Sequence, residues 1–173
     1  MAVKKAVRER PSWSESYMFS ALGAAWRSSC LYLQTGAVIV KDKRIIASGY
    51  NGAPPGIENC LEVGCRKDRE HVDFDDKGKG VCRGIHAEIN AMSQISREDL
   101  KGTTLYSLYY PCSACAKEIV GNGIDSVFYS KVYSEPDSLT KELFAEAGVK
   151  LRQLSMDTEK CFEMIRGVYQ PKK

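Results

Sequence analysis

Three residues of the chain have the types and spacing of a metal site: His86, Cys112 and Cys115. The two cysteines are three positions apart, so at the start of a helix their side chains face the same side. The positive end of the helix dipole favours thiolates, the form of cysteine that binds metal. One imidazole and two thiolates fill three positions of a tetrahedral zinc ion and leave the fourth to water. That open position is typical of catalytic rather than structural zinc.

A carboxylate follows the histidine by two positions. Bound Zn²⁺ can lower the pKa of its water to about 7, which makes hydroxide available at neutral pH. Glu88 is placed to exchange protons with that water without being a ligand. The H-x-E and P-C-x-x-C segments together form the signature of zinc-dependent nucleobase deaminases. A chance pairing of two unrelated motifs is disfavoured, because both occur in order and each lies at an expected helix start.

The elements that position these residues are predicted to alternate between strands and helices. Ser12 and Glu15 form a capping box before a helix over about 13–28. Stretches 35–40 and 44–50 are rich in β-branched residues and predict a hairpin. The remaining expected elements are a helix carrying Ile85, Ile89 and Met92, a strand at 103–108, a helix with Pro111 in its first turn, a strand at 126–129, a helix capped by Ser138 and ended by Gly148, a strand at 149–154 and a helix capped by Asp157. This order predicts an α/β class with a mixed sheet.

Length and composition are those of a single globular domain over 1–173. The chain has 173 residues, of which 43% are hydrophobic and 27% charged. Its net charge is only +3, which argues against a nucleic-acid partner. The longest apolar stretches, such as 37–40, are too short to cross a bilayer, so no membrane partner is expected. Residues 1–11 are basic with no apolar run, which predicts a flexible tail rather than a signal peptide. Seven cysteines without a secretion signal indicate reduced thiols and a cytoplasmic protein.

The chain resembles the cytidine/deoxycytidylate deaminase family from about Trp13 to about Leu151, most closely its deoxycytidylate branch. The segments that carry the resemblance are Gly-Tyr-Asn-Gly at 49–52, Gly-Ile-His-Ala-Glu-Ile-Asn-Ala at 84–91, Tyr-Pro-Cys-Ser-Ala-Cys-Ala-Lys at 110–117 and Lys-Val-Tyr at 131–133. The resemblance implies a three-layer fold, a five-stranded mixed sheet with helices on both faces. It also implies zinc-dependent hydrolysis of dCMP to dUMP and ammonia with Glu88 moving the protons, and a homo-oligomer, often a hexamer.

By the same resemblance, four residues are expected to touch the substrate. Asn51 would hold the sugar hydroxyl, the Ala87 backbone would contact the base, and Tyr110 would border it. Tyr133 would lie at the phosphate end. For Asn51 the competing role is that of a turn former before Gly52, and for the two tyrosines it is core packing.

The substrate phosphate calls for a cation. Arg27 is the preferred candidate because it lies at the end of the first expected helix, just before the strand that enters the site. Lys117 and Arg83 are the alternatives, and for each of the three the competing role is ordinary solvation at the surface.

The segment 60–83 is dense in charge and predicts a long loop insertion. A closed four-ligand zinc would hold it in place. Some dCMP deaminases carry such a second zinc, and Cys30 and Cys60 fall at matching places, while the other two ligands do not map cleanly. The expected set is Cys30, Cys60, His71 and Cys82, with Cys65 as the substitute for His71. The alternative is a group of buried, reduced cysteines, and Cys161 is expected to be core.

The resemblance also implies feedback control by deoxynucleoside triphosphates. The loop 49–56 after the hairpin is the candidate binding site for such an effector, since glycines let backbone N–H groups approach phosphates. The candidate residues are Gly49, Tyr50, Asn51 and Gly52, with dCTP as activator, dTTP as inhibitor and Mg²⁺ accompanying the triphosphate. The alternative is a tight connection without a ligand.

Rival functions share the zinc motif or the fold. Another cytosine nucleotide such as dCTP, or cytidine, remains open as substrate. A tRNA adenosine deaminase would need a basic surface that the scattered charge does not suggest. A non-enzymatic binding module is hard to reconcile with four intact catalytic positions.

Overall fold

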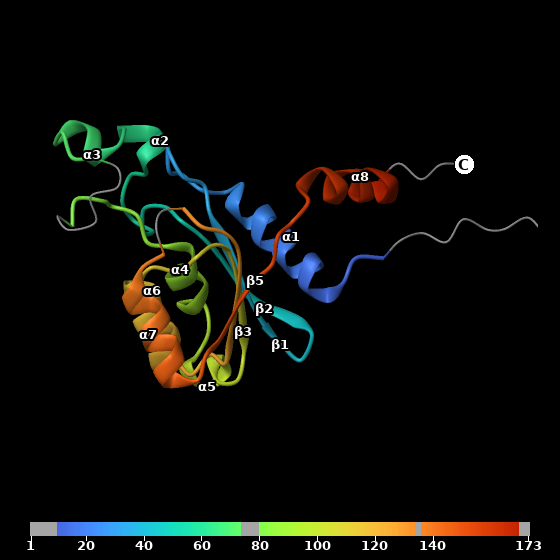
Figure 1. Ribbon diagram of the computed structural model, residues 1–173. Helices are drawn as coiled ribbons and strands as arrows, with labels where there is room; N and C mark the ends of the chain where they lie inside the picture. The colour runs from blue at the N-terminus through green and yellow to red at the C-terminus, as the bar shows by residue number, and fades with distance from the viewer. Residues whose placement is uncertain (1–9, 74–79, 134–135, 170–173) are drawn as a thin grey trace, which may run out of the picture.

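The computed structural model describes residues 10–73, 80–133 and 136–169. Most of the expected tail, at 1–9, and part of the expected insertion, at 74–79, lie outside the described residues. Within them the chain forms a five-stranded sheet in the order β2-β1-β3-β4-β5 (Figure 1). The strands are β1 (Gly36–Lys41), β2 (Arg44–Tyr50), β3 (Thr104–Tyr109), β4 (Ser126–Lys131) and β5 (Lys150–Gln153). β1 is antiparallel to β2 and β3, whereas β3, β4 and β5 are parallel, which confirms the mixed sheet.

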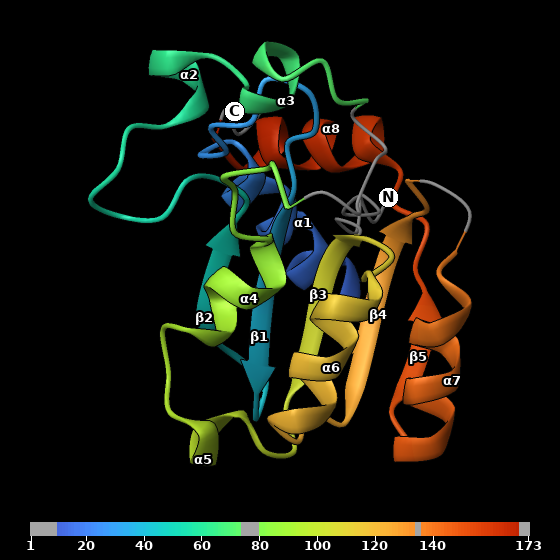
Figure 2. The ribbon, with the colours of Figure 1, turned by 90° about the vertical axis from the view of Figure 1, so that its left-hand side faces the viewer.

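Helices cover both faces of this sheet, as expected. One face carries α1 (Trp13–Ala25) and α8 (Thr158–Tyr169), and the other carries α4 (Ala87–Met92), α6 (Ser113–Gly121) and α7 (Ser138–Ala147) (Figures 1 and 2). Three further helices are a single turn each: α2 (Cys60–Val63), α3 (Arg66–Arg69) and α5 (Arg97–Leu100). In Figure 2, α2 and α3 lie beyond the ends of the strands, on the side of the molecule where α4 begins.

Strand β1, which lies between β2 and β3, explains how the sheet supports two cores. Ala37 and Ile39 point into the core shared with α4 and α6, while Val38 and Val40 point into the core shared with α1. All four are buried. Because successive side chains of a strand alternate between faces, a continuous apolar run is what a strand covered on both sides requires.

Some element boundaries differ from the expected ones for local reasons. The capping box of α1 is present, but the helix ends at Ala25 instead of about 28. Pro111 precedes the N-cap Cys112 and so lies before α6 rather than in its first turn. Asp137, not Ser138, caps α7, because its carboxylate accepts a hydrogen bond from the backbone N–H of Leu139.

Two other expectations about packing were wrong. Ile85 lies before α4, where it forms an isolated bridge with Gly52, so the buried face of the helix is formed by Ala87, Glu88, Ala91 and Met92. Cys161 is only half-buried, as α8 has no buried residue.

The expected loop insertion and two expected caps can also be compared with the structure. The segment 60–83 is not loop throughout, since it contains α2 and α3. The αL cap at Gly148 and the cap at Asp157 are confirmed.

Gly49 permits the close approach of β2 to α4. A Cβ atom at this position would lie 2.3 Å from the backbone nitrogen of Ala91 and 2.4 Å from the carbonyl oxygen of Ala87. Both obstacles are backbone atoms, so the clash is relieved only if the helix moves. We therefore expect Gly49→Ala to lower the free energy of unfolding by about 1–3 kcal/mol.

Urea denaturation of Gly49→Ala checks this expectation. Gly167→Ala is the control, because nothing lies within 4 Å of the Cβ position at Gly167 in α8. A Gly49→Ala protein as stable as the wild type would mean that β2 and α4 are not packed this tightly.

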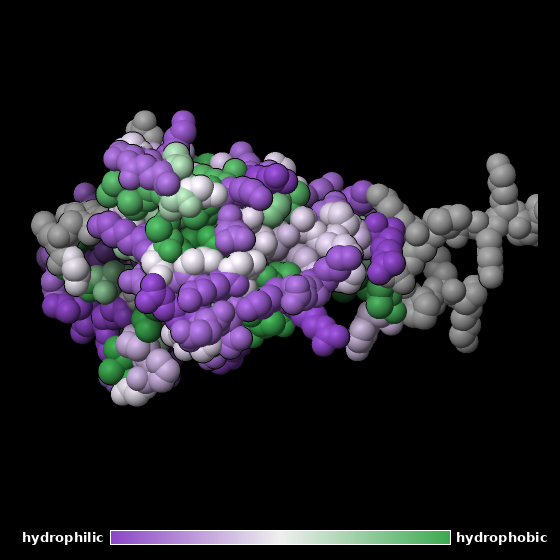
Figure 3. Space-filling view, turned by 90° about the horizontal axis from the view of Figure 1, so that it is seen from below, coloured by the Kyte–Doolittle hydropathy of each residue, from purple (hydrophilic) through white to green (hydrophobic). Residues whose placement is uncertain are grey.

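No helix of the described residues combines the length and the apolar character that crossing a bilayer requires. On the face shown in Figure 3, hydrophobic residues occur in separate patches among hydrophilic ones.

Candidate metal centre and active site

The expected metal ligands come together at one end of the sheet. His86 is the N-cap of α4, Cys112 is the N-cap of α6, and Cys115 lies in the first turns of α6. The Nδ1 atom of His86 lies 3.4 Å from the sulfur of Cys112 and 3.3 Å from that of Cys115. In a tetrahedral zinc site with ordinary bond lengths, a histidine nitrogen and a cysteine sulfur lie roughly 3.6 Å apart. The donor set therefore fits a zinc ion closely.

No other group of three His, Cys, Asp or Glu side chains in residues 10–73, 80–133 and 136–169 brings its ligand atoms within 4.8 Å of one another. One imidazole with two thiolates leaves a tetrahedral ion one position for water or substrate. The centre therefore has the composition of a catalytic site.

Hydrogen bonds around the start of α6 hold the cysteine segment in place. The carboxylate of Asp137 accepts from the backbone N–H of Ser113 at 3.0 Å and, through its other oxygen, from that of Leu139 at 3.0 Å. The hydroxyl of Thr140 donates to the carbonyl oxygen of Pro111 at 3.1 Å. Asp137 thus links the N-termini of α6 and α7, and the residue before Cys112 is fixed from α7.

The two cysteine sulfurs differ in their affinity for a proton. The Cys115 thiol, together with the His86 ring, lowers the pKa of Cys112 to about 3 against the opposing effect of burial. The Cys112 sulfur, burial and the Glu88 carboxylate raise the pKa of Cys115. These opposite shifts favour the thiolate form of Cys112 and the thiol form of Cys115. Metal binding needs both thiolates, so it releases that proton.

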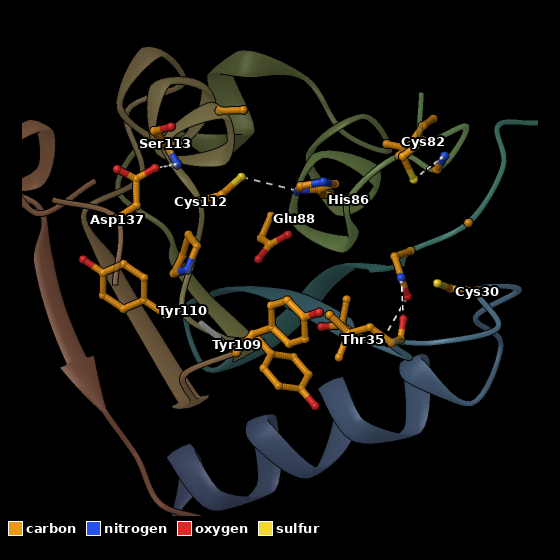
Figure 4. A pocket seen from close by; sticks show the side chains of 18 of the residues that line it. Cys30, Thr35, Cys82, His86, Glu88, Tyr109, Tyr110, Cys112, Ser113 and Asp137 are labelled. Atoms are coloured by element: carbon orange, nitrogen blue, oxygen red, sulfur yellow. Dashed lines mark hydrogen bonds between the residues drawn. The ribbon is translucent and has the colours of Figure 1, made fainter. Parts of the chain in front are cut away.

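Glu88 is a buried carboxylate beside this centre. Its side chain is only 5% exposed. One carboxylate oxygen accepts a 2.8 Å hydrogen bond from the hydroxyl of Ser107, and the other accepts one from the Cys115 thiol at 3.5 Å. Figure 4 shows Glu88 between Cys112 and His86, facing the same cavity. The geometry therefore suits a proton carrier that stands next to the metal without binding it.

Ser107 is a functional candidate that sequence reasoning missed. It is fully buried in β3, on the face that α4 covers. Its signal in the sequence is a single hydroxyl inside an otherwise apolar and aromatic strand, Leu-Tyr-Ser-Leu-Tyr at 105–109. Only the fold reveals that this hydroxyl meets the carboxylate of Glu88.

We expect Ser107→Ala to lower kcat about tenfold. The reason is that the hydroxyl holds one oxygen of Glu88 in place, and a hydrogen bond to a charged group contributes about 1.5–3 kcal/mol. Ser107→Thr retains the hydroxyl and is the rescue variant, while Ser93→Ala on the exposed surface is the control. A Ser107→Ala enzyme with the kcat of the wild type would show that the hydroxyl does not position Glu88.

A cavity of about 490 Å³ opens over the metal centre. This volume is within the range of sites for small molecules. Of the expected substrate contacts, Asn51, Tyr110 and Tyr133 line it. Ala87 is fully buried and is not among the lining residues, and Arg27 is exposed on the surface outside them. Of the expected effector residues, Asn51 and Gly52 line this same cavity, whereas Gly49 and Tyr50 do not.

The side chain of Asn51 is engaged in holding the segment 28–35. Its carbonyl oxygen accepts from the hydroxyl of Ser28 at 2.6 Å and from the backbone N–H of Thr35 at 2.9 Å. Its amide donates to the carbonyl oxygen of Leu33 at 2.7 Å. Asn51 therefore has a structural role in this wall of the cavity, and any bond to a ligand would use its second amide hydrogen.

The two expected tyrosines lie at the other wall. The ring of Tyr110 meets that of Tyr129 edge-on at 5.1 Å, and Tyr133 meets Tyr109 in the same way at 6.2 Å. Burial, followed by the charges of Tyr129 and Asp137, raises the pKa of Tyr110. Tyr110 therefore remains a neutral hydroxyl at physiological pH.

The remaining cysteines near the site do not form a ligand set at metal-binding distances. Cys30, Cys60 and Cys82 line the cavity, and Figure 4 shows Cys30 and Cys82 on the side opposite Tyr110 and Asp137. His71 is exposed and is not among the lining residues. Burial, and then the sulfurs of Cys65, Cys30 and Cys82, raise the pKa of Cys60, so these three sulfurs each lie within electrostatic reach of Cys60.

The fold and the site define a three-layer α/β protein with a catalytic-type His-Cys-Cys metal centre and a buried glutamate. Residues 11–131 match the model of the cytidine and deoxycytidylate deaminase zinc-binding region. The chain belongs to this family.

Relatives and a solved structure support the assignment over most of the chain. The chain is 42% identical to a deoxycytidylate deaminase of Mycobacterium phage D29 over 70% of this chain and 97% of the relative. It is 36% identical to a human deoxycytidylate deaminase over 88% of this chain and 84% of the relative. The structure of the cyanophage S-TIM5 dCMP deaminase in complex with dCMP and dUMP aligns with a TM-score of 0.66 at 28% identity, over 85% of this chain and all of that chain.

Proposed function

We propose that the protein is a zinc-dependent enzyme that hydrolyses dCMP to dUMP and ammonia. The observation that carries the proposal is the buried carboxylate of Glu88 beside a His-Cys-Cys centre at the wall of a cavity of mononucleotide size. The names of the relatives and the nucleotides bound to the cyanophage enzyme favour dCMP among the substrates of the family.

The chemistry follows from the positions of these residues. Bound zinc would act as a Lewis acid that makes water a nucleophile at neutral pH. Glu88 takes a proton from the water that attacks C4 of the base and delivers it to N3. It then moves the remaining proton of the attacking oxygen to the amine, the bond between C4 and the amine nitrogen breaks, and ammonia leaves as the C4 carbonyl of dUMP forms. Ser107 holds one oxygen of Glu88, and the other, which accepts from the Cys115 thiol, would become available to the water and the base once Cys115 binds zinc as a thiolate.

We also propose the residues that contact the sugar, the base and the phosphate of the substrate. Asn51 is proposed to hold the sugar hydroxyl, the Ala87 backbone to contact the base, and Tyr110 and Tyr133 to border the base and the phosphate. Cavity lining supports this for Asn51, Tyr110 and Tyr133. Arg27 was expected to hold the phosphate, but its exposed position outside the lining residues gives this no support.

Turnover of a substrate panel tests the proposed function. Purified zinc-loaded protein is incubated separately with dCMP, CMP, deoxycytidine and dCTP, and the products are separated by chromatography. Preferential conversion of dCMP supports the proposal. Conversion of dCTP instead would keep the chemistry and change the substrate, and turnover of none of the four would contradict the proposal.

We also propose a second, structural zinc held by Cys30, Cys60 and Cys82 with a fourth ligand from α3 or the residues beside it. The expected fourth ligand was His71, with Cys65 as its substitute. The exposed position of His71 and the proximity of Cys65 to Cys60 favour Cys65. Four sulfur ligands closing around zinc would hold the charged segment that contains α2 and α3.

Native mass spectrometry of the protein tests the second zinc. Two zinc ions per chain are expected, falling to one in Cys60→Ser and remaining at two in Cys161→Ser. A single zinc in the wild type would overturn this proposal and leave the catalytic centre untouched.

We also propose the regulation and the assembly that the resemblance to the family implies. We expect activation by dCTP and inhibition by dTTP, with Mg²⁺ accompanying the triphosphate, and a homo-oligomer, often a hexamer. Gly49 is explained by its packing against α4, so support for an effector site there is limited to Asn51 and Gly52. Rates unchanged by either nucleotide would contradict the regulation, and a monomeric mass in solution would contradict the assembly.

A further inference from the structure

The peptide groups on both sides of Cys112 are held from α7, which carries none of the three metal ligands. The carbonyl oxygen of Pro111, in the peptide group before Cys112, accepts from the hydroxyl of Thr140 at 3.1 Å. The N–H of Ser113, in the peptide group after Cys112, donates to the carboxylate of Asp137 at 3.0 Å. Because each peptide group is planar, rotation about either backbone bond of Cys112 would turn one of them away from its partner. These two hydrogen bonds therefore fix φ and ψ of Cys112, and with them the direction of its Cα–Cβ bond.

The side chain of Cys112 does not hold the start of α6 by itself. An N-cap side chain usually accepts a hydrogen bond from a backbone N–H of the first turn. Cys112 is the N-cap of α6 and makes no such bond. Its sulfur lies 3.4 Å from the Nδ1 atom of His86 instead, and Figure 4 shows it pointing away from Asp137. The carboxylate of Asp137 thus satisfies a backbone donor of the first turn, and the cysteine side chain can serve as a metal ligand.

The groups that hold Cys112 are themselves fixed in the fold. Thr140 is fully buried, as is Pro111, whose carbonyl oxygen it holds. Phe144, one turn further along α7, packs into the core shared with α4 and α6. α6 and α7 lie side by side on the same face of the sheet (Figure 2). A shift of Cys112 would leave a buried hydroxyl without its partner, which is unfavourable where water cannot replace the hydrogen bond.

We propose that Asp137 and Thr140 are positioning residues for the metal ligand Cys112, and that they raise the zinc affinity of the centre. This inference rests on the zinc centre of the proposed function and is independent of which nucleotide the cavity binds. A ligand that is already held in the direction it takes in the complex loses little freedom on binding, so the affinity is higher. Removal of groups that orient metal ligands typically lowers metal affinity by about 10- to 100-fold.

The zinc affinity of Thr140→Val tests the inference, because valine resembles threonine in shape and cannot donate the hydrogen bond. Thr103→Val is the matched control. Thr103 is also fully buried, and its hydroxyl donates to the carbonyl oxygen of Leu100 at 2.7 Å, before the end of β3 that is remote from Cys112. We expect Thr140→Val to bind zinc about 10- to 100-fold more weakly than the wild type, and Thr103→Val to stay within about twofold of it. Thr140→Ser retains the hydroxyl and should recover most of the loss.

Asp137→Ala removes both acceptor oxygens and is expected to weaken zinc binding in the same direction. Ser138→Ala, at the exposed next residue of α7, is its control and should bind zinc like the wild type. An Asp137→Ala protein with the zinc affinity of Ser138→Ala would remove Asp137 from the proposal.

Zinc retained per chain is measured at a series of buffered free zinc concentrations, with urea midpoints to verify folding. The zinc of this centre is the amount by which each protein exceeds Cys112→Ser, which lacks one of its ligands. Equal zinc affinity in Thr140→Val and Thr103→Val, whether unchanged or lowered alike, would overturn the inference and leave the proposed function standing. A wild type that holds no more zinc than Cys112→Ser would instead refute the zinc centre on which the proposed function depends.

Discussion

Glu88→Gln is expected to lower kcat by about 10²- to 10⁴-fold while zinc content and stability stay near those of the wild type. The range is that of general acid–base catalysis by a positioned side chain. Glutamine has nearly the same shape, and its carbonyl oxygen can still accept the hydrogen bond from Ser107. What it cannot do is take a proton from water and hand it to the base. The effect is therefore expected in kcat, with little change in substrate affinity.

Rate and zinc measurements on the same preparation check this expectation. Glu118→Gln is the matched control, because Glu118 is an exposed residue of the neighbouring helix α6. A Glu88→Gln enzyme that retains more than about a tenth of the wild-type kcat would fall outside the range of general acid–base catalysis, and another group would then have to move the proton.

Cys112→Ser is expected to abolish activity through loss of zinc. Cys112 is the N-cap of α6, and its side chain makes no capping hydrogen bond there. Serine is among the preferred N-cap residues, so the helix should be at least as stable after the change. The variant removes one of the two thiolate ligands and leaves a hydroxyl, which binds zinc far less well. We expect zinc affinity to fall at least about 100-fold, more than for changes outside the ligand shell.

Zinc retained after dialysis against a competing chelator measures this effect, with circular dichroism to verify the fold. Cys161→Ser is the control, because Cys161 lies on α8 against the opposite face of the sheet. If Cys112→Ser kept stoichiometric zinc and full turnover, the metal centre would have to use a different ligand set.

The sequence predicted the elements that depend on local patterns. The capping box of α1, the hairpin of β1 and β2, and the left-handed cap at Gly148 each follow from a few adjacent residues. The predicted boundaries were wrong where a contact with a residue distant in sequence determines the end of an element. Asp137 caps α7 because its carboxylate bridges two helix N-termini, which the residues around Ser138 do not reveal.

The candidate site divides in the same way. His86, Glu88, Cys112 and Cys115 carry chemistry in their types and spacing, so a motif is enough to select them. Ser107 is a serine inside an apolar and aromatic strand. Its significance arises only when the fold brings its hydroxyl to the carboxylate of Glu88. Exposed Arg27 was selected by its position in the chain, which does not determine which way a helix end faces.

The formation of dUMP and ammonia from dCMP by zinc-loaded protein tests the central claim most directly. Both products are quantified over time, at several zinc occupancies, in the wild type and in Glu88→Gln. The account predicts equal amounts of dUMP and ammonia, at a rate proportional to bound zinc and nearly abolished in the variant. A folded, fully zinc-loaded wild type that releases neither product from dCMP would contradict it.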